Sequence, residues 1–307
     1  MRMSKLEELV EILATHMPKV MRWSGALAKQ LRNHAIAVVG KTSGSANTDA
    51  LTLADLSIQE LIVSALRDAD PLLRECRIEA EESTGDLECF TKESEFVIGI
   101  DPVDGTKQYR DKTGDGYAVM LLLRTQETVH YSLVYIPESG SSGTWVEVRD
   151  NIVKCGEDDW QRPARSVLDS LPARNDEASS QNIYLIGFIE EDPKRAEDVT
   201  SLGLKGFTSE TMPGSIYELQ ASNRFSGSLI HSPNVYDFPV SLHIARSWGG
   251  DAVWVHNNQS VHFSELWLDN RADMLRLPGI VACSANAEVR NQLCELAKDW
   301  NPKRYCH

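Results

Sequence analysis

The chain has 307 residues, of which 42% are hydrophobic and 25% are charged, and its formal net charge is −14. This composition is that of an ordinary globular protein, and the length allows one large domain or two smaller ones. The acidic balance argues against binding to nucleic-acid polymers or to anionic membrane surfaces, but a bound metal ion could still attract a small phosphorylated molecule.

The sequence also bears on location. No uninterrupted apolar run reaches the roughly 20 residues that a membrane-spanning helix needs, and the first residues, Met-Arg-Met-Ser-Lys-Leu-Glu-Glu, lack an apolar signal core. The six cysteines are scattered and include no Cys-x-x-Cys pair. We therefore expect a cytoplasmic protein with reduced thiols, rather than disulfides or a zinc site.

Helical patterns dominate the start of the chain. Apolar residues recur at helical spacing over residues 5–38, and Pro18 is expected to separate or kink two helical pieces. Residues 40–48 have the composition of a loop. An amphipathic helix is predicted over residues 56–66, and Asp55 just before it is typical of a first-turn acid that complements the helix dipole.

Two strands follow. Residues 77–85 indicate a short strand that enters a turn with consecutive acids, which are either solvated or bound to an ion. The apolar run 96–100 predicts a buried strand, and Pro102 should end it because proline cannot donate to a sheet ladder. Asp101 and Asp104 would then lie at the carboxyl end of a strand, where open α/β sheets place their ligands.

Helices and strands alternate along the rest of the chain. Up to residue 180 we expect strands at 117–123 and 129–136, a hairpin of 145–148 and 152–155 around Asp150-Asn151, and a polar connecting segment at 157–180. Beyond it we expect strands at 183–189, 225–231, 252–256, 260–263 and 279–283, and helices at 193–202, 214–221, 238–248 and 287–300. Asp237 precedes one of these helices at a position typical of a capping residue. The pattern predicts a layered α/β or α+β fold, with an N-terminal half over 1–180 and a C-terminal half over 181–307.

The stretch Asp101-Pro102-Val103-Asp104-Gly105-Thr106 carries the clearest chemistry. Two clustered carboxylates beside turn amides that favour an anion suggest a divalent cation that bridges to a phosphate. For an isolated Asp-x-x-Asp the alternative is a turn with two solvated aspartates. Motifs elsewhere in the sequence are needed to choose between a metal site and such a turn.

Together with Glu81-Glu82-Ser83 upstream and Tyr236-Asp237 downstream, this stretch resembles the inositol monophosphatase superfamily of magnesium-dependent, lithium-sensitive phosphatases. That superfamily includes inositol monophosphatases, fructose-1,6-bisphosphatases and 3'(2'),5'-bisphosphate nucleotidases. The D-P-x-D-G-T pattern is highly specific, and Thr52-x-x-Asp55 and Gly214-Ser215 match further motifs in the same order, so the resemblance covers nearly the whole chain. It implies a layered α-β-α-β-α sandwich and the hydrolysis of a small phosphorylated metabolite.

The resemblance also implies a metal cluster and the roles of its residues. Two Mg²⁺ ions would be held by the carboxylates of Glu81, Asp101, Asp104 and Asp237 and by the backbone carbonyl of Val103. Asp55 would take part in catalysis by helping to hold a third, weaker ion or its water, and Glu81 and Thr106 would orient and activate the attacking water. Contacts to the substrate would come from Asp104, Gly105, Thr106, Gly214 and Ser215. Two such ions can position the water, neutralise the phosphate oxygens and stabilise the leaving alkoxide.

Three departures from the family pattern bear on activity and substrate. The usual W-D-x-A-[AG]-G motif is replaced by residues 236–241, whose bulkier side chains could narrow the pocket or lower activity. Residues 229–232 contain no acid to meet an inositol hydroxyl, which argues against an inositol ring. The glycine that often precedes the acidic pair is absent, so the ligand could shift from Glu81 to Glu79 or Glu82.

The substrate class stays open between two hypotheses. Gly105-Thr106-Lys107, with an aromatic residue at Tyr109, resembles the 3'(2'),5'-bisphosphate nucleotidases and histidinol-phosphatase-like members. The other hypothesis is a sugar or inositol phosphate. A haloacid-dehalogenase-like phosphatase is disfavoured because Pro102 stands two residues before Asp104, where that class has its nucleophilic aspartate. A catalytically weakened member that binds metal or phosphate is a further alternative. Dimers are common in the family, so the resemblance also favours a homodimer.

Overall fold

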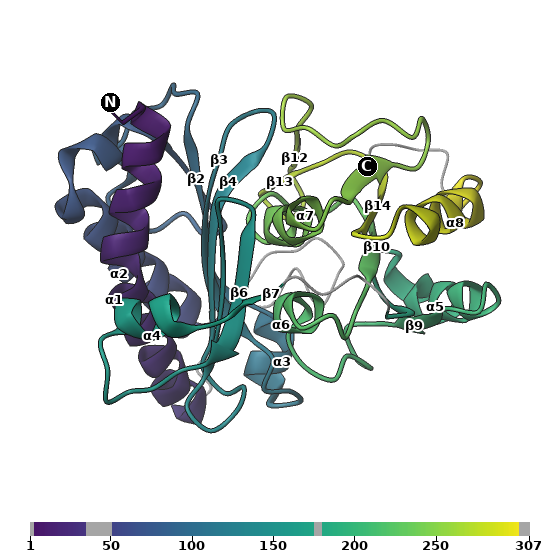
Figure 1. Cartoon of the computed structure of the whole chain (residues 1–307), viewed down its shortest axis with the longest axis horizontal. Coiled ribbons are helices and arrows are strands. Elements are labelled where there is room, and N and C mark those ends of the chain that lie inside the picture. The colour runs from purple at the N-terminus through teal and green to yellow at the C-terminus, as the bar shows by residue number, and fades with distance from the viewer. Residues whose placement is uncertain (1–2, 35–50, 175–179, 301–307) are drawn as a thin grey trace.

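Two β-sheets alternate with three layers of helices across the molecule (Figure 1). The structure is a computed structural model that describes residues 3–34, 51–174 and 180–300, and the predicted loop at 40–48 lies outside them. In the described part of the chain, one helical layer covers the outer face of each sheet and another lies between the sheets. The layered α-β-α-β-α sandwich that the sequence predicts is therefore confirmed.

The first sheet consists of seven strands in chain order, of which the first two are parallel and the others antiparallel. The β5–β6 turn holds Asp150 and Asn151 at φ 53° and 59°, the left-handed conformation that a two-residue hairpin loop of this kind requires. The predicted hairpin is thus confirmed. The strands are β1 (Arg77–Ala80), β2 (Val97–Asp104), β3 (Ala118–Arg124), β4 (Val129–Ile136), β5 (Thr144–Arg149), β6 (Ile152–Glu157) and β7 (Ala173–Arg174).

Three helices gather on the outer side of this sheet: α1 (Lys5–His34), α2 (Leu53–Ala69) and α4 (Ala164–Ser170). Helix α1 runs through Pro18, so of the two predicted effects of this proline the separation into two pieces is wrong, and the kink stays a prediction. A proline inside a helix leaves the carbonyl four residues earlier without its usual donor, and here Arg165 Nη1 donates to that carbonyl, Ala14 O, at 3.3 Å. Helix α4 and strand β7 form within the segment that the polar sequence predicts as a connection.

The second sheet has the strand order β11-β14-β10-β8-β9. Strands β8, β9 and β10 run parallel, and β14 is antiparallel to both of its neighbours. The predicted strand at 260–263 is wrong, because Ser260 forms an isolated bridge with Val253 and not part of a strand. The strands are β8 (Asn182–Ile186), β9 (Lys205–Phe207), β10 (Gly227–His231), β11 (Asp251–Trp254) and β14 (Ile280–Ser284), and a separate hairpin pairs β12 (Trp267–Asp269) with β13 (Met274–Arg276).

The helices of the second half occupy two layers (Figure 1). Helices α6 (Ile216–Ala221) and α7 (Phe238–Ser247) lie between the sheets, while α5 (Asp192–Thr200) and α8 (Ala287–Ala297) cover the far side of the second sheet. A hydrophobic cluster in the middle layer includes residues from both sheets and from both inner helices. The two parts of the chain therefore share a core.

Strand β2 continues through Pro102 to Asp104, so the prediction that Pro102 ends the strand is wrong. Parallel pairing with β1 stops at Ala80 and Ile100, and the register against β3 shifts between Asp101 and Asp104. Pro102 thus lies in a bulge, where its missing N–H costs no ladder hydrogen bond. The bulge re-aims the last residues of β2 before the chain enters α3 (Thr106–Asp111).

Candidate active site

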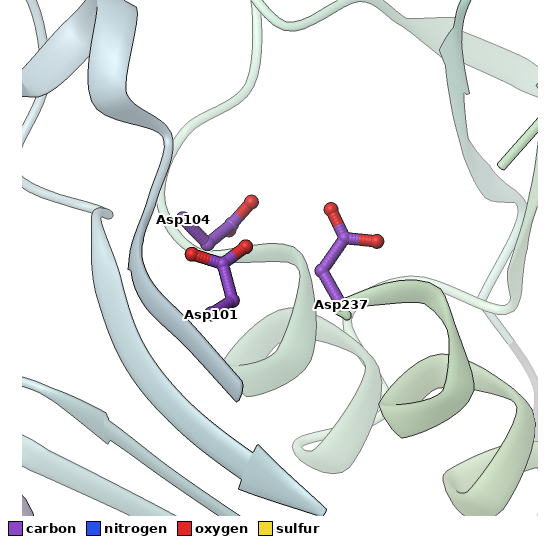
Figure 2. Close-up of side chains that lie close together, drawn as sticks. All are labelled: Asp101, Asp104 and Asp237. Carbon is purple, nitrogen blue, oxygen red and sulfur yellow. The ribbon is translucent and has the colours of Figure 1, made fainter. Parts of the chain in front are cut away.

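Three aspartates from two distant parts of the chain lie close together (Figure 2). Asp101 and Asp104 lie at the end of β2, and Asp237 immediately precedes α7. One carboxylate oxygen of each lies within 4.8 Å of one from each of the others. The tertiary fold therefore brings the Asp-x-x-Asp pair and the downstream aspartate into one cluster.

The cluster concentrates negative charge in a buried place. Burial raises the pKa of Asp101 and of Asp104 well above the usual value, and their acidic neighbours raise both further. Burial and the charge of Glu81 raise the pKa of Asp237 to about 7. Oδ1 of Asp101 is buried and has no hydrogen-bond partner among the described residues. A divalent cation would relieve this repulsion and supply the missing partner, and oxygen ligands are those that Mg²⁺ prefers.

Asp237 is held by its neighbour Asn234 and does not act as a helix cap. Its side chain makes no capping hydrogen bond; instead it accepts from Asn234 Nδ2 at 3.0 Å. Asn234 Oδ1 in turn accepts from the backbone amides of Tyr236 and Asp237 at 2.8 and 3.0 Å. The capping role that the sequence position suggests is therefore wrong, and the carboxylate is free to face the other aspartates.

Glu81 lies beside the aspartates. Its backbone N–H donates to Ile100 O at 3.1 Å, next to Asp101, and its charge is among the causes that raise the pKa of Asp101 and of Asp237. Glu79 is instead paired with Arg77 and Arg124.

The third acid of this segment, Glu82, is buried, and its backbone is fixed by Gln59 of α2. Gln59 Oε1 accepts from Glu82 N at 3.0 Å, and Gln59 Nε2 donates to Thr84 O at 2.8 Å. These contacts hold the acidic turn in one register. The geometry thus favours Glu81 over both alternatives that the sequence leaves open.

Asp55, Thr106 and Val103 form a second buried group. Oδ2 of Asp55 accepts from Thr52 N at 2.7 Å, as part of a capping box at the start of α2. Thr106 Oγ1 lies 3.1 Å from Asp55 Oδ1 and 2.7 Å from Val103 O. Burial raises the pKa of Asp55 to about 6, against the opposing hydrogen bond from Thr52. Asp55 therefore serves both as the predicted first-turn acid and as a partner of Thr106.

The predicted phosphate contacts come from two turns. Gly105 has φ 80°, a left-handed conformation that glycine adopts without strain. Ser215 precedes α6, and its buried Oγ has no partner among the described residues. Gly116 packs directly against Gly214 and Ser215, since an added Cβ would lie 2.5 Å from Gly214 C and 2.6 Å from Ser215 N.

The bulky residues after Asp237 belong to the core. Phe238 and Val240 of α7 are buried in the middle hydrophobic cluster. Helix α7 thus uses these side chains to pack between the sheets, and this packing accounts for them without any contact to a ligand.

Sequence reasoning missed Tyr217, Gln59 and Arg124. Tyr217 is buried in α6, where burial and the nearby charge of Asp104 raise the pKa of its hydroxyl. Gln59 and Arg124 fix the acidic turn through long-range contacts. Only Tyr217 had a usable signal, because it follows Gly214-Ser215 directly in the chain.

Comparison with known proteins identifies related families and folds. The sequence model of the inositol monophosphatase family matches residues 8–292. No curated protein sequence gives a significant match. Among the described residues, no helix combines the length and the apolar character needed to cross a membrane.

Several solved structures share the fold. An IMPase/NADP phosphatase complexed with Mg²⁺ and phosphate aligns with a TM-score of 0.66 at 13% identity, covering 99% of this chain and 100% of that one. An IMPase from Thermotoga maritima aligns with a TM-score of 0.64 at 15% identity, covering 92% and 97%. CysQ from Bacteroides thetaiotaomicron aligns with a TM-score of 0.60 at 15% identity, covering 89% and 97%.

Proposed function

The chain belongs to the inositol monophosphatase family, and we propose that it hydrolyses a small phosphorylated metabolite at the cluster formed by Asp101, Asp104 and Asp237. The family consists of Mg²⁺-dependent phosphatases, and this chain is a phosphomonoesterase. The observation that carries the proposal is the meeting of three carboxylates within 4.8 Å, one of them buried and two partly buried, with a buried oxygen of Asp101 that lacks a partner in the described residues.

In this proposal Glu81, the three aspartates and the carbonyl of Val103 hold two Mg²⁺ ions. When bound, the ions supply an activated water and neutralise the phosphate oxygens. Asn234 orients Asp237, so this carboxylate is fixed before an ion arrives. Asn234 therefore supports binding without being a ligand itself.

Thr106 and Glu81 are proposed to position the attacking water. Thr106 Oγ1 is held beside Asp55 and the Val103 carbonyl, and a hydroxyl fixed in this way can accept a hydrogen bond from a water on its open side. Asp55 is proposed to help hold a third ion, although one of its oxygens is already engaged by Thr52. The capping box thus favours a weaker hold on that ion than on the first two.

Gly105, Thr106, Gly214 and Ser215 are proposed to contact the phosphate. Ser215 supports this role because its Oγ is buried and unpaired in the described residues. A buried hydroxyl without a partner is costly, and a phosphate oxygen would satisfy it.

A second candidate function is a 3'(2'),5'-bisphosphate nucleotidase. Lys107 Nζ lies 3.4 Å from Glu210 Oε1, in the segment between β9 and α6. The Glu210 side chain is largely exposed, so a second phosphate of a substrate could replace this weak ion pair. One of the similar structures is an IMPase/NADP phosphatase complexed with NADP and Ca²⁺, which supports a nucleotide substrate for this chain only as a proposal.

A substrate panel tests both candidates. Phosphate release would be measured with Mg²⁺ from inositol-1-phosphate, 3'-phosphoadenosine 5'-phosphate, fructose-1,6-bisphosphate and histidinol phosphate, with and without Li⁺. Preference for the adenosine bisphosphate would support the nucleotidase, and preference for a sugar or inositol phosphate would support the broader monoesterase. Release from none of the four would contradict both. Inhibition by Li⁺, a cytoplasmic location, a homodimer and the division near residue 180 stay predictions.

A further inference from the structure

We infer that Arg276 is a positioning residue for Asp237, and that it acts by fixing the loop between β10 and α7. This inference rests on the proposed function, because it takes Asp237 to be a metal ligand. Arg276 would touch neither the ion nor the substrate. It would hold the backbone of residues 232–236 in the path that presents the Asp237 carboxylate to the other aspartates.

The first observation is that the Arg276 guanidinium joins the β12–β13 hairpin to this loop. Arg276 is the last residue of β13, and its Nη1 donates to Ser232 O at 3.0 Å. Its Nε donates to Asp269 Oδ2, at the end of β12, at 3.2 Å. The Arg276 and Asp269 side chains are 15% and 5% exposed. The start of the loop is therefore tied to an arginine that is itself anchored and largely shielded from solvent.

The second observation is the backbone conformation of Ser232, the first residue after β10. Its φ is 50°, in the left-handed region, which a residue with a side chain adopts at a cost that surrounding contacts must offset. Arg276 donates to the carbonyl of Ser232, and Gly279 O accepts from its N–H at 2.7 Å. Both backbone polar groups of Ser232 are thus engaged by residues of the segment 276–279.

Further along the loop, the main chain of Arg276 and its neighbours supplies the contacts. Asn234 forms an isolated antiparallel bridge with Arg276. Beside this bridge, Leu277 N–H donates to Pro233 O at 2.9 Å. Arg276 therefore holds the loop twice, with its side chain at Ser232 and with its backbone pairing at Asn234.

Asn234 connects the loop to the proposed metal ligand. Its Nδ2 donates to Asp237 Oδ2 at 3.0 Å, and its Oδ1 accepts from the N–H of Asp237 at 3.0 Å. Outer hydrogen bonds of this kind orient carboxylates that bind metals, and removing one typically weakens metal affinity by about 10- to 100-fold. Arg276 acts one step further from the ion, through the backbone that carries Asn234, so we expect an effect near the lower value.

The charge of Arg276 by itself would act in the opposite direction. A positive charge near the acidic cluster repels another cation, so removal of the charge alone would tighten Mg²⁺ binding or leave it unchanged. A positioning role instead predicts weaker binding when Arg276 is replaced. The sign of the change in Mg²⁺ affinity therefore separates the two effects.

The test is direct Mg²⁺ binding to Arg276→Met, measured by titration calorimetry in the absence of substrate. We expect the Mg²⁺ dissociation constant to rise about 10-fold, and the increase in Tm caused by Mg²⁺ to shrink accordingly. Arg276→Lys keeps the charge but lacks the planar fork that reaches Asp269 and Ser232 O together. Its dissociation constant should lie between those of the wild-type protein and Arg276→Met, and it serves as the test if Arg276→Met does not fold.

Arg22→Met is the matched control. Arg22 is also a largely buried arginine, whose Nε donates to Asp158 Oδ2 at 2.8 Å and whose Nη1 donates to Arg162 O at 2.7 Å. It lies in α1, on the outer side of the first sheet. This control should lose stability and keep the wild-type Mg²⁺ affinity. A purely structural role for Arg276 would give the same pattern in Arg276→Met, and an equal loss of affinity in Arg22→Met would also overturn the inference.

Asp237→Asn separates failure of this inference from failure of the proposed function. Wild-type or tighter Mg²⁺ binding in Arg276→Met, with weakened binding in Asp237→Asn, would overturn the inference alone. Wild-type affinity in both variants, or no Mg²⁺ binding by the wild-type protein, would overturn the proposed site and the inference with it. Weakened binding in Arg276→Met and Asp237→Asn, with Arg22→Met unchanged, is the result that the inference requires.

Discussion

Arg124 and Glu79 form a buried ion pair. Glu79 lies two residues before Glu81 in the chain. The side chains are 2% and 4% exposed, and the Arg124 guanidinium lies 4.4 Å from the centroid of the Phe263 ring. Arg77 also contacts Glu79, from a more exposed position. The pair therefore engages Glu79 and leaves Glu81, two residues further on and just beyond the end of β1, to face the aspartates.

Arg124→Met should destabilise the protein strongly, because it leaves Glu79 buried with only the partly exposed Arg77 as a partner. Breaking a buried pair by removing one member costs about 3–5 kcal/mol, and the remaining contact with Arg77 places the expectation near the lower value. The free energy of unfolding, measured in urea, checks it. Lys298→Met, which removes the exposed pair with Glu295, is the control and should show no measurable change. An equally small change in Arg124→Met would contradict the importance of the buried pair.

Gly116→Ala should reduce activity by moving the start of α6. The new Cβ would lie 2.5 Å from Gly214 C and 2.6 Å from Ser215 N, and backbone atoms cannot move aside as a flexible side chain can. We expect a drop in kcat/KM of about 10-fold or more, since a misplacement of this size at a catalytic site is costly. Gly114→Ala is the matched control on the same turn, because its added Cβ meets only Gln108 at 3.9 Å. Equal activity of the two variants would argue that Gly214-Ser215 is not part of the site.

Acid should destabilise the protein through His243. Burial, helped by the charges of His130 and Arg246, lowers the pKa of this histidine to about 3, while an unfolded histidine titrates near pH 6.5. Between about pH 6.5 and 3 the unfolded chain therefore binds a proton at His243 and the folded chain does not. The neutral His243 contributes its full stabilisation above about pH 6.5, and this contribution is lost as the pH falls toward 3. The slope for one such group is up to about 1.4 kcal/mol per pH unit.

His243→Gln should flatten this dependence when unfolding is measured between pH 7 and pH 5. His243 Nδ1 lies 2.9 Å from Ser132 Oγ, so the variant also loses some stability at pH 7. The pKa of His231 is lowered to about 4 by burial and then by Arg276. This histidine therefore still contributes to the pH dependence of the free energy of unfolding in the variant. An unchanged slope would mean that His243 is not protected from protonation in the folded protein.

Local sequence patterns predicted much of the fold. The bounds of β4 match the predicted strand, and the Asp150-Asn151 turn was recognisable because two consecutive residues with φ above zero favour these side chains. The two errors at prolines have one cause. Both Pro18 and Pro102 are accommodated by features of the tertiary structure, a donor from Arg165 and a bulge against β3, which no local rule can see.

In the candidate site, too, local sequence motifs predicted some features and long-range contacts determined the others. The order of the motifs was enough to predict Asp101, Asp104 and Asp237 as partners, and the structure brings them together. The choice among Glu79, Glu81 and Glu82 depends on Arg124 and Gln59, which lie 45 and 23 residues from the acids that they engage. Pairings over such distances could not be derived from spacing.

Phosphate release by Asp104→Asn, compared with wild type over a range of Mg²⁺ concentrations, tests the central claim most directly. The substitution keeps the size of the side chain and removes one of three mutually repelling carboxylates, so the metal-free variant should remain folded, which its Tm would verify. The account predicts Mg²⁺-dependent release by the wild-type protein and loss of turnover with weaker Mg²⁺ binding in the variant. Unchanged turnover in a folded Asp104→Asn protein would contradict the assignment of the active site.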